Sequence, residues 1–478
     1  MLDRLSAHLA RYCNVYAAIA IATTFAALLG RALAHGGRWD LYDAVGMGDR
    51  VGGAFGYSLG GVDRFEPSTP YFLGASIISY LVGLVAHPVQ VEILLLTATL
   101  LVFTLQGCLF LVYRRIGGQA SFLPYGALSL AVTALCLNKY LDYALEFKPD
   151  TPSLIFFSLA AAVVLSDLAL VKRLALIVLL IAASLLFKQQ IGMAIGALAL
   201  GRLFWGGPIW RRLADVAAIG IGGCLGLLAS LSVPNAVFFA VISHAGRTHL
   251  KLLDMEHAFL LITVVILGGI ILLIRGPKST LSESLRVGKI WPYSLAAVLW
   301  FLVSLAGARN FGGNSGNTAV GLALFLPFAV LLLDKAQPWL RSLMFIALTL
   351  YSTAFLVASH WYSRYQTRIH LEAEIGDQLQ RAGVKTALVS GDSYIAARRG
   401  GVASISEIDT WAHIHNGVSR DKVVKDGVQL VDELKPDAIV CMQTCSVFLR
   451  YKFDPAQMGY RAVTLPDSKS HDILYLKP

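Results

Sequence analysis

Long apolar runs recur along the first 360 residues and constrain the fold more than any other feature of the sequence. They occur at 12–34, 91–113, 121–137, 151–171, 173–187, 189–205, 213–233, 256–275, 290–306, 317–333 and 341–359. A helix needs about 20 apolar residues to cross the hydrocarbon core of a bilayer. The runs therefore predict a polytopic α-helical membrane protein with about 11 spans.

The composition supports a membrane protein and argues against nucleic-acid binding. Of the 478 residues, 56% are hydrophobic and 15% are charged, whereas a soluble domain carries about 25% charged residues. The formal net charge of +10 comes from short basic clusters that lie mostly between apolar runs. Clusters placed in this way are typical of topology signals, so we expect no nucleic acid among the partners.

The basic clusters predict the orientation of the chain. They are Arg114-Arg115, Lys172-Arg173, Arg211-Arg212 and the loops 275–289 and 335–341. All fall on the cytoplasmic side, together with the N-terminus, if residues 71–87 lie in the interface or form half of a re-entrant pair. We therefore expect a retained signal-anchor helix first, a cytoplasmic N-terminus and an extracytoplasmic C-terminus.

Polar residues gather on the opposite, outer face. The long loop 35–71 follows the first span, and Asp40 and Asp43 lie near its start, flanked by Trp39 and Tyr42. A carboxylate at a membrane surface can act as a general base for an attacking hydroxyl, and neighbouring aromatic residues suit sugar binding. We predict that 35–71 is the catalytic loop; a solvated acid or a helix cap is the alternative.

Three basic residues on the outer face could meet a phosphate. Lys148 precedes a span together with Asp150, Lys188 lies between two apolar runs, and Arg309 emerges into a Gly/Asn-rich loop. Burying an unpaired lysine in a membrane costs about 2.5–3.5 kcal/mol, which an anionic partner would offset. Interfacial anchoring is the alternative for Lys148.

The tail, residues 361–478, is predicted to be a small soluble α/β domain outside the membrane. Strands are expected at 385–390, 437–442 and 472–476, and a helix at 419–434. No GxGxxG follows the first strand, so a dinucleotide site is not expected. His413 and His415 have no evident third metal ligand, and Cys441 and Cys445 are either a disulfide or a reduced buried pair.

Three segments carry a resemblance to a known group of enzymes. They are EPSTPYF at 66–72, the segment 143–150 with its closing KPD, and FKQ at 187–189. With a single helix followed by a long outer loop that opens with an acid, residues 1–360 resemble the GT-C superfamily of membrane glycosyltransferases. The closest likeness is to the family 39-like bacterial relatives of protein mannosyltransferases and of the lipid A aminoarabinose transferase.

The resemblance implies a polyprenyl-phosphate sugar donor. Asp40 matches the position of the catalytic base, with Asp43 as the other candidate. The implied substrate-binding residues are Glu66, Tyr143, Lys148, Asp150, Lys188, Gln189 and Arg309. No metal ligand and no cofactor are expected, although a divalent metal stays open. The family often has an Asp-Glu pair or a Tyr-Pro-Pro entry, and this chain has neither, so the choice of base stays open.

The resulting expectation is an inverting transferase in the bacterial inner membrane. It would move a hexose or pentose from the lipid-linked donor to an envelope glycan, lipid or protein on the outer face. The alternatives are a transporter or flippase of lipid-linked sugars, an O-antigen polymerase or ligase, and a non-catalytic assembly or sensor protein.

Overall fold

The computed structural model describes most of the apolar part of the chain and the core of the tail. The described residues are 2–35, 45, 74–86, 89–136, 141, 144–145, 147–205, 207–231, 290–309, 315–389, 396–397, 400–405, 431–432, 435–441, 455–464 and 473–477. The chain packs as two compact units, one formed by 1–31, 97–232 and 248–359, the other by 32–96, 233–247 and 360–478.

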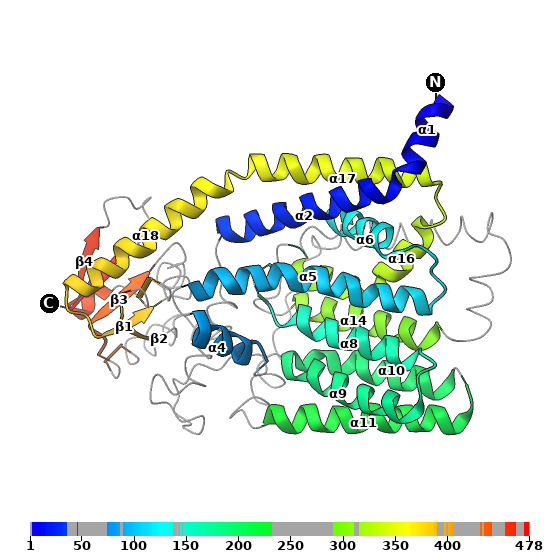
Figure 1. Ribbon diagram of the computed structural model, residues 1–478. Helices are drawn as coiled ribbons and strands as arrows, with labels where there is room; N and C mark the ends of the chain where they lie inside the picture. The colour runs from blue at the N-terminus through cyan, green and yellow to red at the C-terminus, as the bar shows by residue number, and fades with distance from the viewer. Residues whose placement is uncertain are drawn as a thin grey trace. The chain divides into compact units, whose positions relative to one another are not determined.

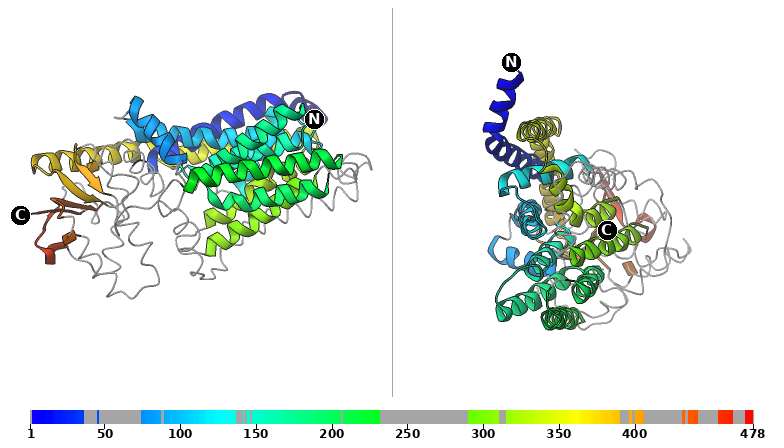
Figure 2. Two further views of the ribbon diagram at one scale, coloured as in Figure 1. Left: turned by 90° about the horizontal axis from the view of Figure 1, so that it is seen from below. Right: turned by 90° about the vertical axis from the view of Figure 1, so that its right-hand side faces the viewer.

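Helices dominate the first unit (Figure 1). They are α1 (Leu2–Arg11), α2 (Cys13–His35), α5 (Gln90–Arg115), α6 (Phe122–Cys136), α8 (Asp150–Val164), α9 (Leu170–Phe187), η2 (Gln189–Ile191), α10 (Gly192–Phe204), α11 (Ile209–Leu231), α14 (Trp291–Arg309), α15 (Ser315–Leu322), η5 (Ala323–Phe325), α16 (Leu326–Leu333) and α17 (Pro338–Ala358). In the right-hand view of Figure 2 the green helices are seen nearly end-on, so their axes are roughly aligned. Helix α9 packs on α8 and α11, and α10 packs on α11 and α14.

Small residues let the backbones of these helices approach one another. A Cβ atom at Gly222 would lie 2.7 Å from the carbonyl oxygen of Val178, and one at Gly226 would lie 2.9 Å from that of Ala182. Both glycines are on α11, four residues apart, and both partners are on α9. This is the GxxxG arrangement of membrane helices, in which close packing replaces the hydrophobic effect as the driving force.

The expected span at 317–333 is broken into α15, η5 and α16. Pro327 lies in the first turn of α16, and proline prevents a continuous helix through the preceding turn. Helix α14 satisfies carbonyls around the break, since the Tyr293 hydroxyl donates to Leu324 (2.7 Å) and the Trp300 indole N–H donates to Val320 (3.2 Å). Backbone groups inside a membrane need such partners.

Five segments of the described chain are long and apolar enough to cross a membrane: Cys13–Ala34, Gln90–Arg115, Leu170–Phe187, Ile209–Ala229 and Pro338–Arg381. Shorter apolar helices cover Ile77–Ala86, Phe122–Ala134, Asp150–Val164, Trp291–Ala306 and Ala319–Leu333. The run at 256–275 lies outside the described residues, so the number of about 11 spans stays a prediction. The boundary between the runs at 173–187 and 189–205 falls at Lys188.

The basic pair Lys172-Arg173 lies at the start of a helix and not between two helices. The helix formed by the apolar run at 151–171 ends at Val164, and the next helix, α9, begins at Leu170. Both basic residues therefore lie in the first turn of α9. Lys172 is exposed, whereas Arg173 is buried.

The second unit contains α4 (Gly74–Ala86), the first turns of α5 and helix α18 (Trp361–Arg381). Helix α4 has 13 residues and so is about 20 Å long, which is short of the hydrocarbon core of about 30 Å. The side-chain amide of Gln90 donates to the Ser79 carbonyl oxygen at 2.6 Å and ties α4 to the start of α5. This length is compatible with the interfacial placement expected for 71–87.

A five-stranded sheet forms the core of the tail. Its strands are β1 (Thr386–Val389), β2 (Ala403–Ile405), β3 (Ala438–Cys441), β4 (Arg461–Thr464) and β5 (Ile473–Leu476), in the order β2-β1-β3-β5-β4. Strands β1, β2 and β3 are parallel, whereas β5 is antiparallel to both β3 and β4. The three expected strands are thus present, and two further strands complete the sheet. Most of the helix expected at 419–434 lies outside the described residues.

Candidate functional site

A buried ion pair joins the start of α8 to the end of α9. The ammonium nitrogen of Lys188 lies 2.5 Å from Oδ1 of Asp150, and the two side chains are 8% and 3% exposed. Lys188 follows the last residue of α9 in an extended conformation and precedes η2. The lysine therefore lies at the break between the two helical segments. The sequence-based prediction named both residues, and the structure brings them together.

Two serines hold the helices together next to this pair. The Ser153 hydroxyl donates to the Ser184 carbonyl oxygen at 3.0 Å, and the Ser184 hydroxyl donates to the Ser153 carbonyl oxygen at 2.8 Å. Ser153 lies three residues after Asp150, and Ser184 lies four residues before Lys188. Residues three or four apart share one face of a helix, so the serine contacts lie about one turn from the ion pair.

The chain enters α8 through a turn that carries the second lysine. Lys148 is 9% exposed, and it follows Phe147, which is buried and has a φ of 57°. A bulky residue with positive φ is an outlier that the surrounding structure must hold. Pro149 caps α8, and Asp150 occupies its first turn, where a negative charge suits the helix dipole.

The structure describes the other predicted site residues only in part or not at all. Gln189 begins η2 directly after Lys188. Arg309 is the last residue of α14, but its side chain lies outside the described atoms. Asp40, Asp43, Glu66 and Tyr143 lie outside the described residues, as do His413, His415 and Cys445.

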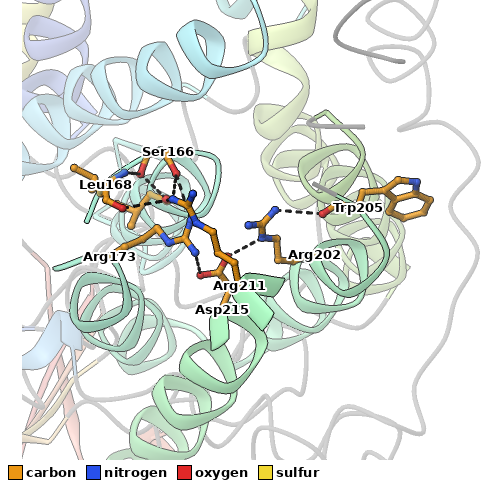
Figure 3. A network of polar contacts seen from close by, with 8 residues as sticks. Ser166, Leu168, Arg173, Arg202, Trp205, Arg211 and Asp215 are labelled. Carbon is orange, nitrogen blue, oxygen red and sulfur yellow. Dashed lines mark hydrogen bonds and ion pairs between the residues drawn. The ribbon is translucent and has the colours of Figure 1, made fainter. Parts of the chain in front are cut away.

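A second charged cluster lies at the other end of α9 (Figure 3). Arg173 and Arg202 both bind Asp215 of α11, with nitrogen to oxygen distances of 2.6 Å and 2.7 Å. Arg173 and Lys188 are separated by 15 positions, or about 22 Å of helix, so this cluster is separate from the candidate site. The sequence-based analysis missed it, although an acid such as Asp215 inside an apolar run is itself a signal of a specific partner.

Among the described residues, the Asp150–Lys188 site and its sequence neighbour Lys148 contain more cationic than anionic groups. Lys148 and Lys188 contribute two cationic groups, and Asp150 offers one carboxylate. Buried lysine binds phosphate as a point charge, and a low local dielectric strengthens this attraction. Within the described part of the chain, no three His, Cys, Asp or Glu side chains form a group that could hold a metal ion. Such an arrangement is suited to an anion next to the turn between α9 and α10.

The fold is shared with a solved enzyme structure. The chain superposes on ArnT from Cupriavidus metallidurans bound to undecaprenyl phosphate, with a TM-score of 0.58 and 12% sequence identity, over 96% of this chain and 97% of that chain. This likeness shows a GT-C-like fold.

No protein-family model matches the sequence. No curated protein matches it either. The likeness of this chain to a known protein therefore rests on its fold alone.

Proposed function

We propose that the chain is a membrane glycosyltransferase that uses a polyprenyl-phosphate-linked sugar as donor. The buried, electropositive group of Lys148, Asp150 and Lys188 carries this proposal, because the donor's leaving group is an anionic phosphate. The fold supports it, since the similar ArnT structure is bound to undecaprenyl phosphate. The acceptor is an envelope glycan, lipid or protein on the outer face of the bacterial inner membrane.

In the proposed reaction, Asp40 takes the proton of an acceptor hydroxyl, with Asp43 as the other candidate base. The hydroxyl oxygen then forms a bond to the anomeric carbon from the face opposite the phosphate. The bond from that carbon to the phosphate oxygen breaks, its electron pair stays on the phosphate, and the configuration inverts. Lys148, Lys188 and Arg309 stabilise the charge on the departing lipid phosphate.

Within this site, Asp150 positions Lys188. The carboxylate holds the ammonium group at 2.5 Å, and the extended backbone at Lys188 directs the side chain out of the helical path. A preorganised cation costs no reorganisation when charge develops on the leaving group. Gln189, Glu66 and Tyr143 complete the proposed substrate contacts.

The test is transfer of labelled sugar from polyprenyl-phosphate donors in membranes that contain equal amounts of each variant. Lys188→Gln should lower transfer roughly 10²-fold, as the loss of one charge-stabilising group does in other enzymes. Lys172→Gln is the matched control, because it removes the same charge from an exposed position near the other end of α9. Asp40→Asn should abolish transfer and keep donor binding.

Each alternative has its own outcome in the same assay. Equal transfer by Lys188→Gln and Lys172→Gln would contradict the proposed role of the site in stabilising the donor phosphate. Unchanged transfer by Asp40→Asn would move the base to Asp43. If the native protein transfers no sugar across a broad donor and acceptor panel but moves lipid-linked sugars between vesicle leaflets, it is a flippase.

A further inference from the structure

The end of the first unit opposite the candidate site carries excess positive charge. The described charged side chains near the starts of α9 and α11 and the end of α10 include Lys172, Arg173, Arg202, Arg211 and Arg212 on one hand, and Asp167 and Asp215 on the other. This described group thus contains five cationic and two anionic side chains. Asp215 is already bound by two arginines, and Asp167 is exposed. Among the described side chains, this group therefore has an excess of positive charge that an external anion could balance.

Arg211 and Arg212 are the half-buried members of this cluster. One guanidinium nitrogen of Arg211 lies 3.4 Å from the carbonyl oxygens of Ser166 and Leu168 after α8. Arg212 donates to the carbonyl oxygens of Leu203 and Phe204 at 2.9 Å. In the described part of the chain neither arginine forms an ion pair with a carboxylate. Backbone carbonyl groups hold both side chains in place without neutralising them, so the positive charge of each guanidinium group can attract a further partner.

Exposed aromatic side chains surround the two arginines. Trp210 is 58% exposed and directly precedes Arg211, and Phe204 is 61% exposed. The indole of Trp205 lies with its ring centre 5.9 Å from that of Trp291, and Figure 3 shows it directed away from the Asp215 network. Tryptophan is enriched at the level of lipid headgroups. Exposed tryptophans next to the two arginines match the pattern expected at that level of a membrane.

We propose that Arg211 and Arg212 bind the headgroup phosphate of anionic phospholipids, with Trp205 and Trp210 packed beside the upper acyl chains. A guanidinium group matches a phosphate with two parallel hydrogen bonds. Basic residues near a membrane surface are attracted to anionic lipids, and no soluble anion would account for the exposed tryptophans. The buried Arg173–Asp215–Arg202 network fixes the helix ends that present the two arginines. This inference does not depend on the proposed transferase activity.

The experiment follows thermal unfolding of the full-length protein in detergent with added phosphatidylglycerol or phosphatidylcholine of identical acyl chains. Phosphatidylglycerol should raise the melting temperature more than phosphatidylcholine does. Arg211→Gln/Arg212→Gln should lose at least half of that difference and keep the response to phosphatidylcholine. Arg114→Gln/Arg115→Gln is the matched control, since it removes two exposed arginines from the end of α5 and should keep the difference.

Three results of the unfolding experiment would overturn the proposal. The first is an undiminished phosphatidylglycerol effect in the Arg211/Arg212 variant, and the second is an equal loss in both double variants. The third is the same stabilisation by inorganic phosphate, which would indicate a small-anion site. A second measurement does not depend on the folding of the Arg211/Arg212 variant. Brominated phosphatidylglycerol should quench the tryptophan fluorescence of the native protein more than brominated phosphatidylcholine does. Trp210→Phe should reduce that difference. Equal quenching by the two lipids would also contradict the proposal.

Discussion

Ser153 of α8 and Ser184 of α9 exchange hydrogen bonds, each hydroxyl donating to the carbonyl oxygen of the other residue. Both side chains are fully buried. Hydrogen bonds between membrane helices contribute about 0.6 kcal/mol on average. The Ser153→Ala/Ser184→Ala variant should therefore lose about 1 kcal/mol of unfolding free energy, measured by denaturant titration in micelles. Ser359→Ala is the control, because its hydroxyl bonds only within its own helix end. A loss no larger than the control's would contradict the prediction.

The Asp150–Lys188 pair should show strong coupling in a double-mutant cycle. Asp150→Asn leaves the buried Lys188 ammonium without its carboxylate, and breaking a buried pair in this way costs about 3–5 kcal/mol. Removing both charges with Asp150→Asn/Lys188→Gln should cost clearly less than the sum of the single changes. Unfolding free energies of the four proteins measure the coupling. Additive losses would mean that the two side chains act independently.

Gly222 should tolerate no side chain, whereas its neighbour Gly223 should. A Cβ atom at Gly222 would lie 2.7 Å from the Val178 carbonyl oxygen, but one at Gly223 meets nothing within 4 Å. Gly222→Ala forces α9 and α11 apart and should cost about 1–3 kcal/mol, as overpacking does elsewhere. Gly223→Ala should be neutral or slightly stabilising, since alanine is the better helix former. The comparison uses thermal unfolding in one detergent, and equal effects at the two positions would rule out the close α9–α11 contact.

The sheet of the tail should lose stability in acid through Asp437. Hydrogen bonds from the backbone N–H groups of Lys385 and Thr386, at 3.0 Å and 3.1 Å, hold the pKa of the Asp437 carboxyl below its usual value. A lowered folded-state pKa stabilises the sheet above the unfolded pKa of about 3.9, and this contribution is lost as the pH falls through the folded pKa. The protection factor of the Thr386 amide, which compares its hydrogen exchange with the intrinsic rate at the same pH, should therefore fall below about pH 4. Asp437→Asn should show no such acid dependence, and an identical pH profile for the two proteins would contradict this role.

Most helix positions could be predicted from the sequence, because a run of apolar residues long enough for a bilayer has few other stable conformations. The runs at 12–34 and 91–113 became α2 and α5 within a few residues. The buried strands of the tail were predictable for a similar reason, since short apolar segments such as 438–441 fit a covered sheet. Lys148, Asp150 and Lys188 stood out because charge is costly at the edge of an apolar run.

Contacts between distant segments required the tertiary structure. Nothing local assigns Asp150 to Lys188 or Ser153 to Ser184, because these partners are 38 and 31 positions apart and meet only when α8 packs antiparallel to α9. The burial of Arg173 likewise depends on Asp215, which α11 brings to the first turn of α9. Local sequence determined which segments enter the membrane through the free energy of transfer from water. Helix packing decided which charges meet, because electrostatic and hydrogen-bond energies depend on distance in space and on burial.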